Sequence, residues 1–345
     1  MTEGFGNGAA GRLRFDGPVD RSLVHRHADT EVFVTDHLSL GDNRFAVAAR
    51  LPASHSYFTD DPLRSALVDP MLLLECSRQS GTLVAHSHLG VPADTAFLIT
   101  EWSFEFDADS LMTPHGAGPD PATELTIVIE ARDLKKRGNR LLGATLVSEL
   151  YLSGRRMGSS TICAGYPTRP GYESFRTMRR SSPAPLSDSM SRHRVGTPPG
   201  SRGVGRTLDA NVVVSAVRAV EGGLTADLDV PVGHPVFYDH PLDHVPATAL
   251  LEAARQAALL AVAPTEGIGE EGGEGKEGRE GGVWRVSAMS AGFQRFVELD
   301  SPTTVSARVE PDEERRVVRV TFEQGDAVAC HCELTVFKAV APEAG

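Results

Sequence analysis

The feature that most constrains the fold of this 345-residue chain is a polar motif that occurs twice inside apolar sequence. Residues 72–80 read LLLECSRQS and residues 250–258 read LLEAARQAA, so both contain the pattern E-x-x-R-Q. A buried helix has little use for an acid and a base, because an unpaired charge is costly away from water. Two copies half a chain apart therefore predict a duplicated domain whose central helix carries a polar site.

The similarity between the two halves extends beyond these helices. VHRHADTEVFVT at residues 24–35 aligns with VGRTLDANVVVS at residues 204–215, and FTDDPL at 58–63 aligns with YDHPL at 238–242. Three blocks that recur in the same order indicate an internal repeat, and with two copies this is a duplication and not a solenoid. The length of the chain also favours two domains.

The repeat sets the predicted domain boundaries. We expect an N-terminal domain at residues 20–166, a connector at 167–203 and a C-terminal domain at 204–340. The connector is rich in Arg, Pro and Ser, and it is either a solvated linker or a docking strip for an acidic partner or a phosphate. Residues 265–282, a Gly/Glu tract without apolar content after Ile268, are expected to be disordered because they cannot build a core.

Each half is predicted to contain one long helix and several antiparallel strands. Partial period-2 alternation and β-branched residues, as in LTIVIEARDL, are typical of half-buried strands. The helices are expected at 70–88 and 246–263, and the strands at 31–36, 45–51, 96–106, 123–134, 141–153, 157–164, 210–217, 223–230, 284–298, 303–310, 315–323 and 327–339. One helix wrapped by an antiparallel sheet, twice, predicts an α+β architecture in which the two sheets become continuous, a dimer within one chain.

Composition excludes several classes of function. The formal charge of −12 argues against a nucleic-acid partner, which needs a basic field. No uninterrupted apolar run is long enough to span a membrane, and the N-terminus does not read as a signal peptide. The four cysteines lack metal-ligand spacing, so we expect reduced thiols, a cytoplasmic setting, and neither a metal nor a cofactor.

The polar residues of the two helices allow a structural and a functional interpretation. Glu252 and Arg255 are three positions apart, which lets them form a buried ion pair that pins the helix in place. Alternatively the Glu is a general base or acid and the Arg orients it or binds an anion. The preceding loop contains His240 and His244 and ends at Pro246, where the free N–H groups of a helix N-terminus can hold a carbonyl oxygen or an oxyanion.

The run D-H-P-x-D-x-x-P-x-x-x-L-L-E-A-x-R-Q at residues 239–256 resembles the A-factor biosynthesis (AfsA-like) hotdog family of actinomycete γ-butyrolactone synthases. The first copy, from FTDDP at 58–62 through ECSRQ at 75–79, is similar to the N-terminal hotdog of that family. The resemblance covers roughly residues 20–340 and implies a tandem (double) hotdog.

The resemblance also implies a reaction. It is the transfer of a β-ketoacyl group from acyl carrier protein or coenzyme A to the hydroxyl of dihydroxyacetone phosphate, in the synthesis of a butyrolactone- or furan-type signalling molecule. The predicted catalytic residues are Glu252, Arg255, Glu75 and Arg78, and the predicted substrate-binding residues are His240, Tyr238, Gln256 and Gln79. We expect Glu252 to take the hydroxyl proton, and Arg255 or a connector arginine to bind the phosphate.

The wider hotdog set includes dehydratases with a catalytic His in the loop before the helix. The corresponding positions here hold Tyr238 and Asp61, which argues against dehydration. The first copy has Asp61 where the second has His240, so we expect the two sites to differ and the second to be the main one. Two other functions stay open, a hotdog thioesterase and a non-catalytic acyl-ligand binder.

Overall fold

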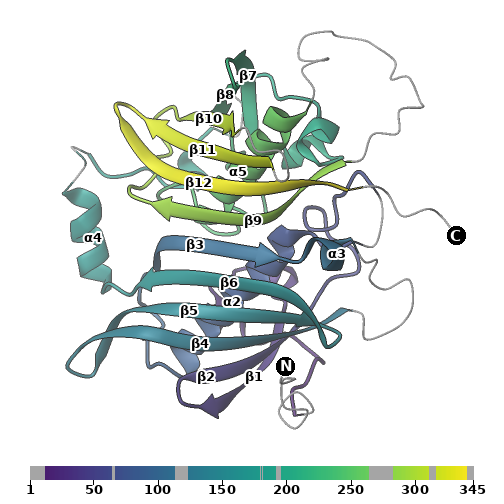
Figure 1. Cartoon of the computed structure of the whole chain (residues 1–345). Helices are drawn as coiled ribbons and strands as arrows, with labels where there is room; N and C mark the ends of the chain where they lie inside the picture. The colour runs from purple at the N-terminus through teal and green to yellow at the C-terminus, as the bar shows by residue number, and fades with distance from the viewer. Residues whose placement is uncertain are drawn as a thin grey trace, which may run out of the picture.

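The structure is a computed structural model, and it describes residues 12–63, 67–112, 123–178, 180, 182–191, 196–263, 283–310 and 316–339. Twelve strands form one antiparallel sheet, in the order β1-β2-β4-β5-β6-β3-β9-β12-β11-β10-β8-β7 (Figure 1). The first half supplies β1 (Val34–Gly41), β2 (Arg44–Arg50), β3 (Leu98–Phe106), β4 (Glu124–Arg137), β5 (Arg140–Leu152) and β6 (Arg155–Gly165). The second half supplies β7 (Val214–Val220), β8 (Gly223–Leu228), β9 (Val283–Phe293), β10 (Thr304–Val309), β11 (Arg316–Gln324) and β12 (Ala327–Ala339).

The two halves join edge to edge through β3 and β9. These strands pair antiparallel from Glu101 opposite Gly292 to Glu105 opposite Ala288. On either side of this join the strands follow the same order, so that β1 corresponds to β7, β2 to β8 and β6 to β12. The topology therefore repeats strand for strand, as the internal sequence similarity predicts, and the halves form a dimer within one chain.

Each half packs one long helix against the sheet, and both helices lie behind it in Figure 1. Helix α2 (Pro70–Ser87) contacts strands of the first half, and α5 (Ala247–Val262) contacts strands of the second. Because both helices are apolar nearly all round, burial on every side is what stabilises them. The predicted α+β double hotdog architecture is confirmed.

Most predicted elements agree with the observed ones to within three residues. The exceptions are β9, which was expected to reach residue 298 but ends at Phe293, and the first strand of each half. Strand β1 was expected from residue 31 and β7 from residue 210, yet they begin at Val34 and Val214. The residues before them form short 3₁₀ turns, η2 (Asp29–Glu31) and η6 (Asp209–Asn211). The other short elements are η1 (Arg21–Val24), α3 (Ala108–Leu111), α4 (Arg169–Thr177), η4 (Ser187–Ser189) and η5 (Ser201–Val204).

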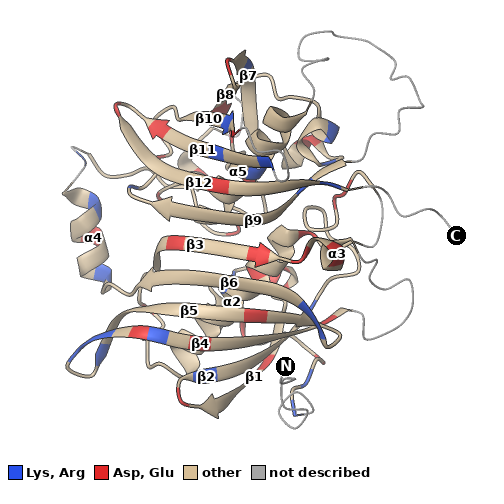
Figure 2. Cartoon of the chain, viewed as in Figure 1, with Lys and Arg blue, Asp and Glu red and all other residues tan. Residues whose placement is uncertain are grey.

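The connector contains α4, which has basic residues at both ends (Figure 2). Arg176 is buried, and it donates to Asp243 Oδ2 at 2.9 Å and to both carboxylate oxygens of Glu298 at 2.7 Å. Arg180 binds Glu298 and Asp300. These arginines therefore attach the connector to the second half, which neither a solvated linker nor a free docking strip would do.

Three further expectations concern the chain as a whole. The four cysteines are free thiols. Among the described helices, none is long and apolar enough to cross a membrane. The cytoplasmic setting stays a prediction, and the tract at 265–282 lies outside the described residues.

Candidate active site

Glu75 on α2 is the centre of the first polar network. Its Oε1 accepts hydrogen bonds from Arg26 Nε at 3.0 Å, Arg78 Nη2 at 2.7 Å and Gln79 Nε2 at 2.7 Å. Its Oε2 accepts from Arg78 Nε at 2.9 Å. The carboxylate is 2% exposed, so two arginines compensate one buried acid.

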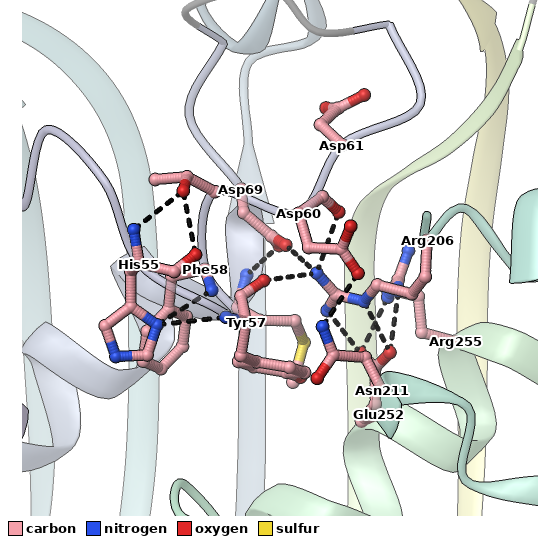
Figure 3. A network of polar contacts seen from close by, with 12 residues as sticks. His55, Tyr57, Phe58, Asp60, Asp61, Asp69, Arg206, Asn211, Glu252 and Arg255 are labelled. Atoms are coloured by element: carbon pink, nitrogen blue, oxygen red, sulfur yellow. Dashed lines mark hydrogen bonds and ion pairs between the residues drawn. The ribbon is translucent and has the colours of Figure 1, made fainter. Parts of the chain in front are cut away.

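Glu252 on α5 is the centre of an equivalent network (Figure 3). Arg206 donates to its two oxygens at 3.0 Å each, and Arg255 donates to them at 2.8 Å and 2.7 Å. Gln256 Nε2 adds a bond of 2.7 Å. With 0% of its surface exposed, Glu252 is fully enclosed.

Arg26 and Arg206 also hold the two halves together. Arg26 Nη1 donates to the carbonyl of Val236 at 2.7 Å, and Arg206 Nη1 donates to the carbonyl of Tyr57 and to Asp69 Oδ2, both at 2.8 Å. Each arginine thus starts in one half, binds the glutamate of that half and ends on a loop of the other. We did not predict this second pair of arginines, although the alignment of VHRHAD with VGRTLD places them opposite each other.

The electrostatics of the networks disfavour the predicted base. Burial alone raises the pKa of Glu75, but Arg26 and Arg78 outweigh it and lower that pKa to about 2. The pKa of Glu252 is lowered as well, against burial, by Arg206 and Arg255. Both carboxylates stay ionised and fully hydrogen-bonded at neutral pH, which makes them weak proton acceptors.

Gln79 and Gln256 also differ from expectation. Gln79 accepts the N–H of Phe33 at 2.9 Å and donates to the carbonyl of Glu31 and to Glu75. Gln256 accepts the N–H of Val213 at 2.8 Å, and it donates to a backbone carbonyl and to its own glutamate. Both side chains are 0% exposed, and these bonds use their amide groups, so they do not fit the predicted role of substrate ligands.

A cavity of about 250 Å³ lies between the two halves. One side is apolar and comes from the first half, with Phe97, Ile99, Trp102, Leu146 and Ile162. The other side is the segment from Val236 to Leu250 of the second half. The polar side chains of the lining include His25, Arg26, Arg78, Asp239, His240, His244 and Arg295.

Two aspartate–histidine pairs lie in that segment. His240 Nδ1 is 2.5 Å from Asp239 Oδ1, and His244 Nδ1 is 2.6 Å from Asp243 Oδ1. Burial raises the pKa of Asp239, but the bonds and charges of His240 and Arg26 bring it down to about 2, so it remains an acceptor. An acceptor at Nδ1 assigns the proton to that nitrogen and leaves Nε2 of His240 able to take another.

Tyr238 does not join this group. Its hydroxyl is buried and lacks a hydrogen-bond partner within the described parts of the chain, and burial raises its pKa. The cavity is lined instead by its neighbours Phe237 and Asp239. Tyr238 is therefore part of the packed core and does not fit the expectation of a substrate ligand.

The N-terminus of α5 faces the cavity with its backbone donors unused. Pro246 precedes the helix and offers no side-chain cap, and Ala247 and Thr248 line the cavity. In the described structure their N–H groups have no acceptor, as is usual for the first turn of a helix. The first turn of α2 is different, because Asp69 caps it by accepting the N–H of Met71 at 2.8 Å.

The corresponding space in the other half of the repeat is nearly closed. It measures about 20 Å³ and is lined by Arg255, Asp61, Asp69 and Arg285. Arg285 donates to Asp61 at 2.6 Å across this space. The two sites therefore differ, as the exchange of Asp61 for His240 suggests, and of the predicted helix arginines it is Arg78 that faces the large cavity.

The fold and this cavity define a double hotdog protein with a pocket shared by its two halves. The sequence model described as "A-factor biosynthesis hotdog domain" matches residues 10–165 and 200–339, and the chain belongs to this family. The family predicted from the doubled motif is confirmed.

Two named relatives match nearly the whole chain. A protein of Streptomyces virginiae named 2-oxo-3-(phosphooxy)propyl 3-oxoalkanoate synthase is 34% identical over 322 residues, which is 91% of this chain and 96% of the relative. A protein of the same name from Streptomyces griseus is 33% identical over 309 residues, or 89% and 91% of the two chains.

Solved structures are more distant. The dehydratase domain from the CurF module of curacin polyketide synthase has a TM-score of 0.48 at 12% identity, covering 89% of this chain and 98% of that domain. The 12:0-ACP thioesterase from Umbellularia californica has a TM-score of 0.45 at 10% identity, covering 87% and 100%.

Proposed function

We propose that the protein joins a 3-oxoacyl group to the hydroxyl of dihydroxyacetone phosphate, as the name of its relatives describes. The acyl donor is a pantetheine thioester, carried by acyl carrier protein or coenzyme A. The observation that supports this best is the shared cavity, which combines an apolar wall, an Asp–His pair, unused arginine N–H groups and an open helix N-terminus. These are the parts that acyl transfer to a phosphorylated alcohol needs.

The acyl group fits the apolar wall of the first half, and the thioester carbonyl then points to the first turn of α5. The N–H groups of Ala247 and Thr248 suit the oxygen that becomes negative during attack. This placement keeps the predicted position of the carbonyl. It differs from the expected mechanism in the residues that move the proton and hold the phosphate.

His240 is the proposed general base. Its Nε2 takes the proton of the triose hydroxyl, the hydroxyl oxygen forms a bond to the acyl carbon, and the carbon–sulfur bond breaks. The proton then passes to the departing thiolate, so the products are an ester and a free thiol. Asp239 holds the ring in place and stabilises its charged form during transfer.

Two arginines are available for the phosphate. Arg295 is exposed at the cavity and has no ion pair within the described residues, and Nη1 of Arg78 likewise has no acceptor there. A dianionic phosphate keeps part of its hydration at the exposed Arg295, which lowers the cost of binding it. Of the connector arginines expected here, Arg176 and Arg180 are occupied by Glu298 and its neighbours.

Mass spectrometry of a reaction between purified protein and acetoacetyl-coenzyme A tests the proposal. With dihydroxyacetone phosphate present we expect the ester. Thioester cleavage without dependence on the triose would identify a thioesterase, and binding without turnover would identify a ligand-binding protein. His240→Gln should lower the rate by about 10²–10⁴, whereas His331→Gln, at an exposed position of β12, should not change it.

A further inference from the structure

His25 has a backbone conformation that its side-chain type rarely adopts. It ends η1 with φ 52° and ψ 53°, in the left-handed region. The corresponding residue of the second copy is Gly205, with φ 71° and ψ 34°. Glycine is the usual choice here because a Cβ is unfavourable in this region. A histidine at such a position costs stability, so its side chain needs another reason to be there.

The difference between the two copies follows the difference between the cavities. A Cβ on Gly205 would lie 3.0 Å from Arg255 Nη1 and 3.1 Å from Leu259 Cδ1, so the nearly closed site has little room for a side chain. In the first copy the ring of His25 lines the large cavity instead, together with Arg78 and His240. The histidine side chain is therefore found in the copy that has an open cavity, and glycine in the copy whose cavity is nearly closed.

Neighbouring groups fix the protonation state of the ring. His86 Nδ1 is 2.8 Å from the carbonyl of Val91 and therefore carries a proton, which makes its Nε2 an acceptor. His25 Nε2 lies 2.9 Å from that atom and must be the donor. The remaining nitrogen, Nδ1 of His25, is then an unprotonated acceptor, and within the described chain it has no partner.

The ring also stays neutral at physiological pH. Burial is the main reason, and the charge of Arg78 and the neighbouring rings of His86 and His240 add to it, holding the pKa of His25 at about 3. Phe97 packs edge-on against the ring at 4.7 Å between centroids and limits its rotation. A base this weak does not accept a proton in catalysis, but it can accept a hydrogen bond.

We propose that His25 is a substrate-binding residue whose Nδ1 accepts a hydrogen bond from an amide N–H of the pantetheine arm. The hydroxyl of dihydroxyacetone phosphate is not available as a donor, because its one proton goes to His240. The inference rests on the proposed function, because it takes its ligand from that reaction. His86 is the positioning residue that fixes the tautomer.

Steady-state kinetics with each substrate varied in turn tests this assignment. His25→Gly and His25→Asn both tolerate the left-handed backbone, so they should melt within a few degrees of wild type. Loss of one hydrogen bond should raise the KM for acetoacetyl-coenzyme A about tenfold. A rise in the KM for dihydroxyacetone phosphate alone would contradict the pantetheine amide as the donor.

The matched control is His37→Asn, since His37 also pairs with a histidine, His88, at 2.8 Å but does not line the cavity. It should leave both KM values unchanged. If wild type forms the ester and both His25 variants keep wild-type KM values for both substrates, the assignment of His25 is wrong. If wild type forms no ester, the proposed function fails instead.

A measurement without turnover tests His25 in either case. In protein labelled with ¹⁵N-histidine, the signals of His25 should show the neutral Nε2–H form, and its Nδ1 signal should shift when acetoacetyl-coenzyme A binds. The signals are assigned with His25→Asn. A charged ring at pH 7, or an Nδ1 signal that acetoacetyl-coenzyme A does not move, would overturn the proposal.

Discussion

Replacing Glu252 with glutamine is expected to damage stability more than chemistry. The carboxylate accepts five hydrogen bonds, from Arg206, Arg255 and Gln256, and none of its surface is exposed. A neutral amide in its place leaves Arg206 with Asp69 as its one counter-charge among the described residues, and leaves Arg255 with none there. Removing one partner of a buried ion pair costs about 3–5 kcal/mol.

The pKa of Glu75, the equivalent glutamate of the first half, indicates a similar contribution to stability. Lowering the pKa of Glu75 from an ordinary 4.5 to about 2 corresponds to about 3 kcal/mol of stability at neutral pH. For a protein of this size, about 3 kcal/mol lowers the melting temperature by on the order of 5–10 °C. We expect this loss for Glu252→Gln and for Glu75→Gln.

Activity should separate the two variants. Arg78, the partner of Glu75, lines the large cavity, whereas Arg255, the partner of Glu252, lines the nearly closed one. Assayed well below its melting temperature, Glu252→Gln should therefore form ester at near the wild-type rate, and Glu75→Gln should not. Thermal unfolding followed by circular dichroism measures the melting temperature, and mass spectrometry measures ester formation. An unchanged melting temperature with abolished ester formation in Glu252→Gln would refute this reasoning and make that residue catalytic.

Three other perturbations follow from the same contacts. The stability that the ionised Glu75 contributes should be fully present above pH 4.5 and should be lost as the pH falls toward 2, because the pKa of Glu75 is depressed in the folded state. Urea unfolding midpoints at pH 7, 4 and 3 would measure this loss. Arg176→Met should cost about 3 kcal/mol and slow ester formation by releasing the loop that carries the histidines, while Arg169→Met, whose ion pair is exposed, should change the unfolding free energy by less than about 1 kcal/mol. Arg285→Ala should lower the melting temperature by leaving Asp61 unpaired, yet keep the wild-type rate; a faster or slower enzyme would show that the small cavity takes part.

Much of the architecture could be predicted because it depends on local sequence patterns, such as residue spacing and apolar periodicity. A glutamate and an arginine three positions apart meet on any helix, so the pairing of Glu252 with Arg255 follows from spacing alone. The wrapped helices and the antiparallel strands follow from apolar periodicity in the same way. The aligned blocks then predict that the second half repeats the plan of the first.

The remaining features of the site depend on contacts that no local pattern contains. Arg206 is 46 positions from Glu252 in the sequence and 137 positions from Asp69, so these three side chains meet only once the chain has folded. The protonation of His25 depends on a carbonyl and a second ring that are distant in sequence. Which helix N-terminus stays open depends on whether an aspartate caps it, a difference of one residue between copies.

Linking the two copies in one chain has a consequence for how such a site can change. In a dimer of identical chains, every substitution occurs in both subunits, so both pockets change in the same way. Here a mutation alters one copy and spares the other. An arginine could therefore fill one pocket through its bond to Asp61 while histidines accumulated around the other, a division that a symmetric ancestor could not have reached.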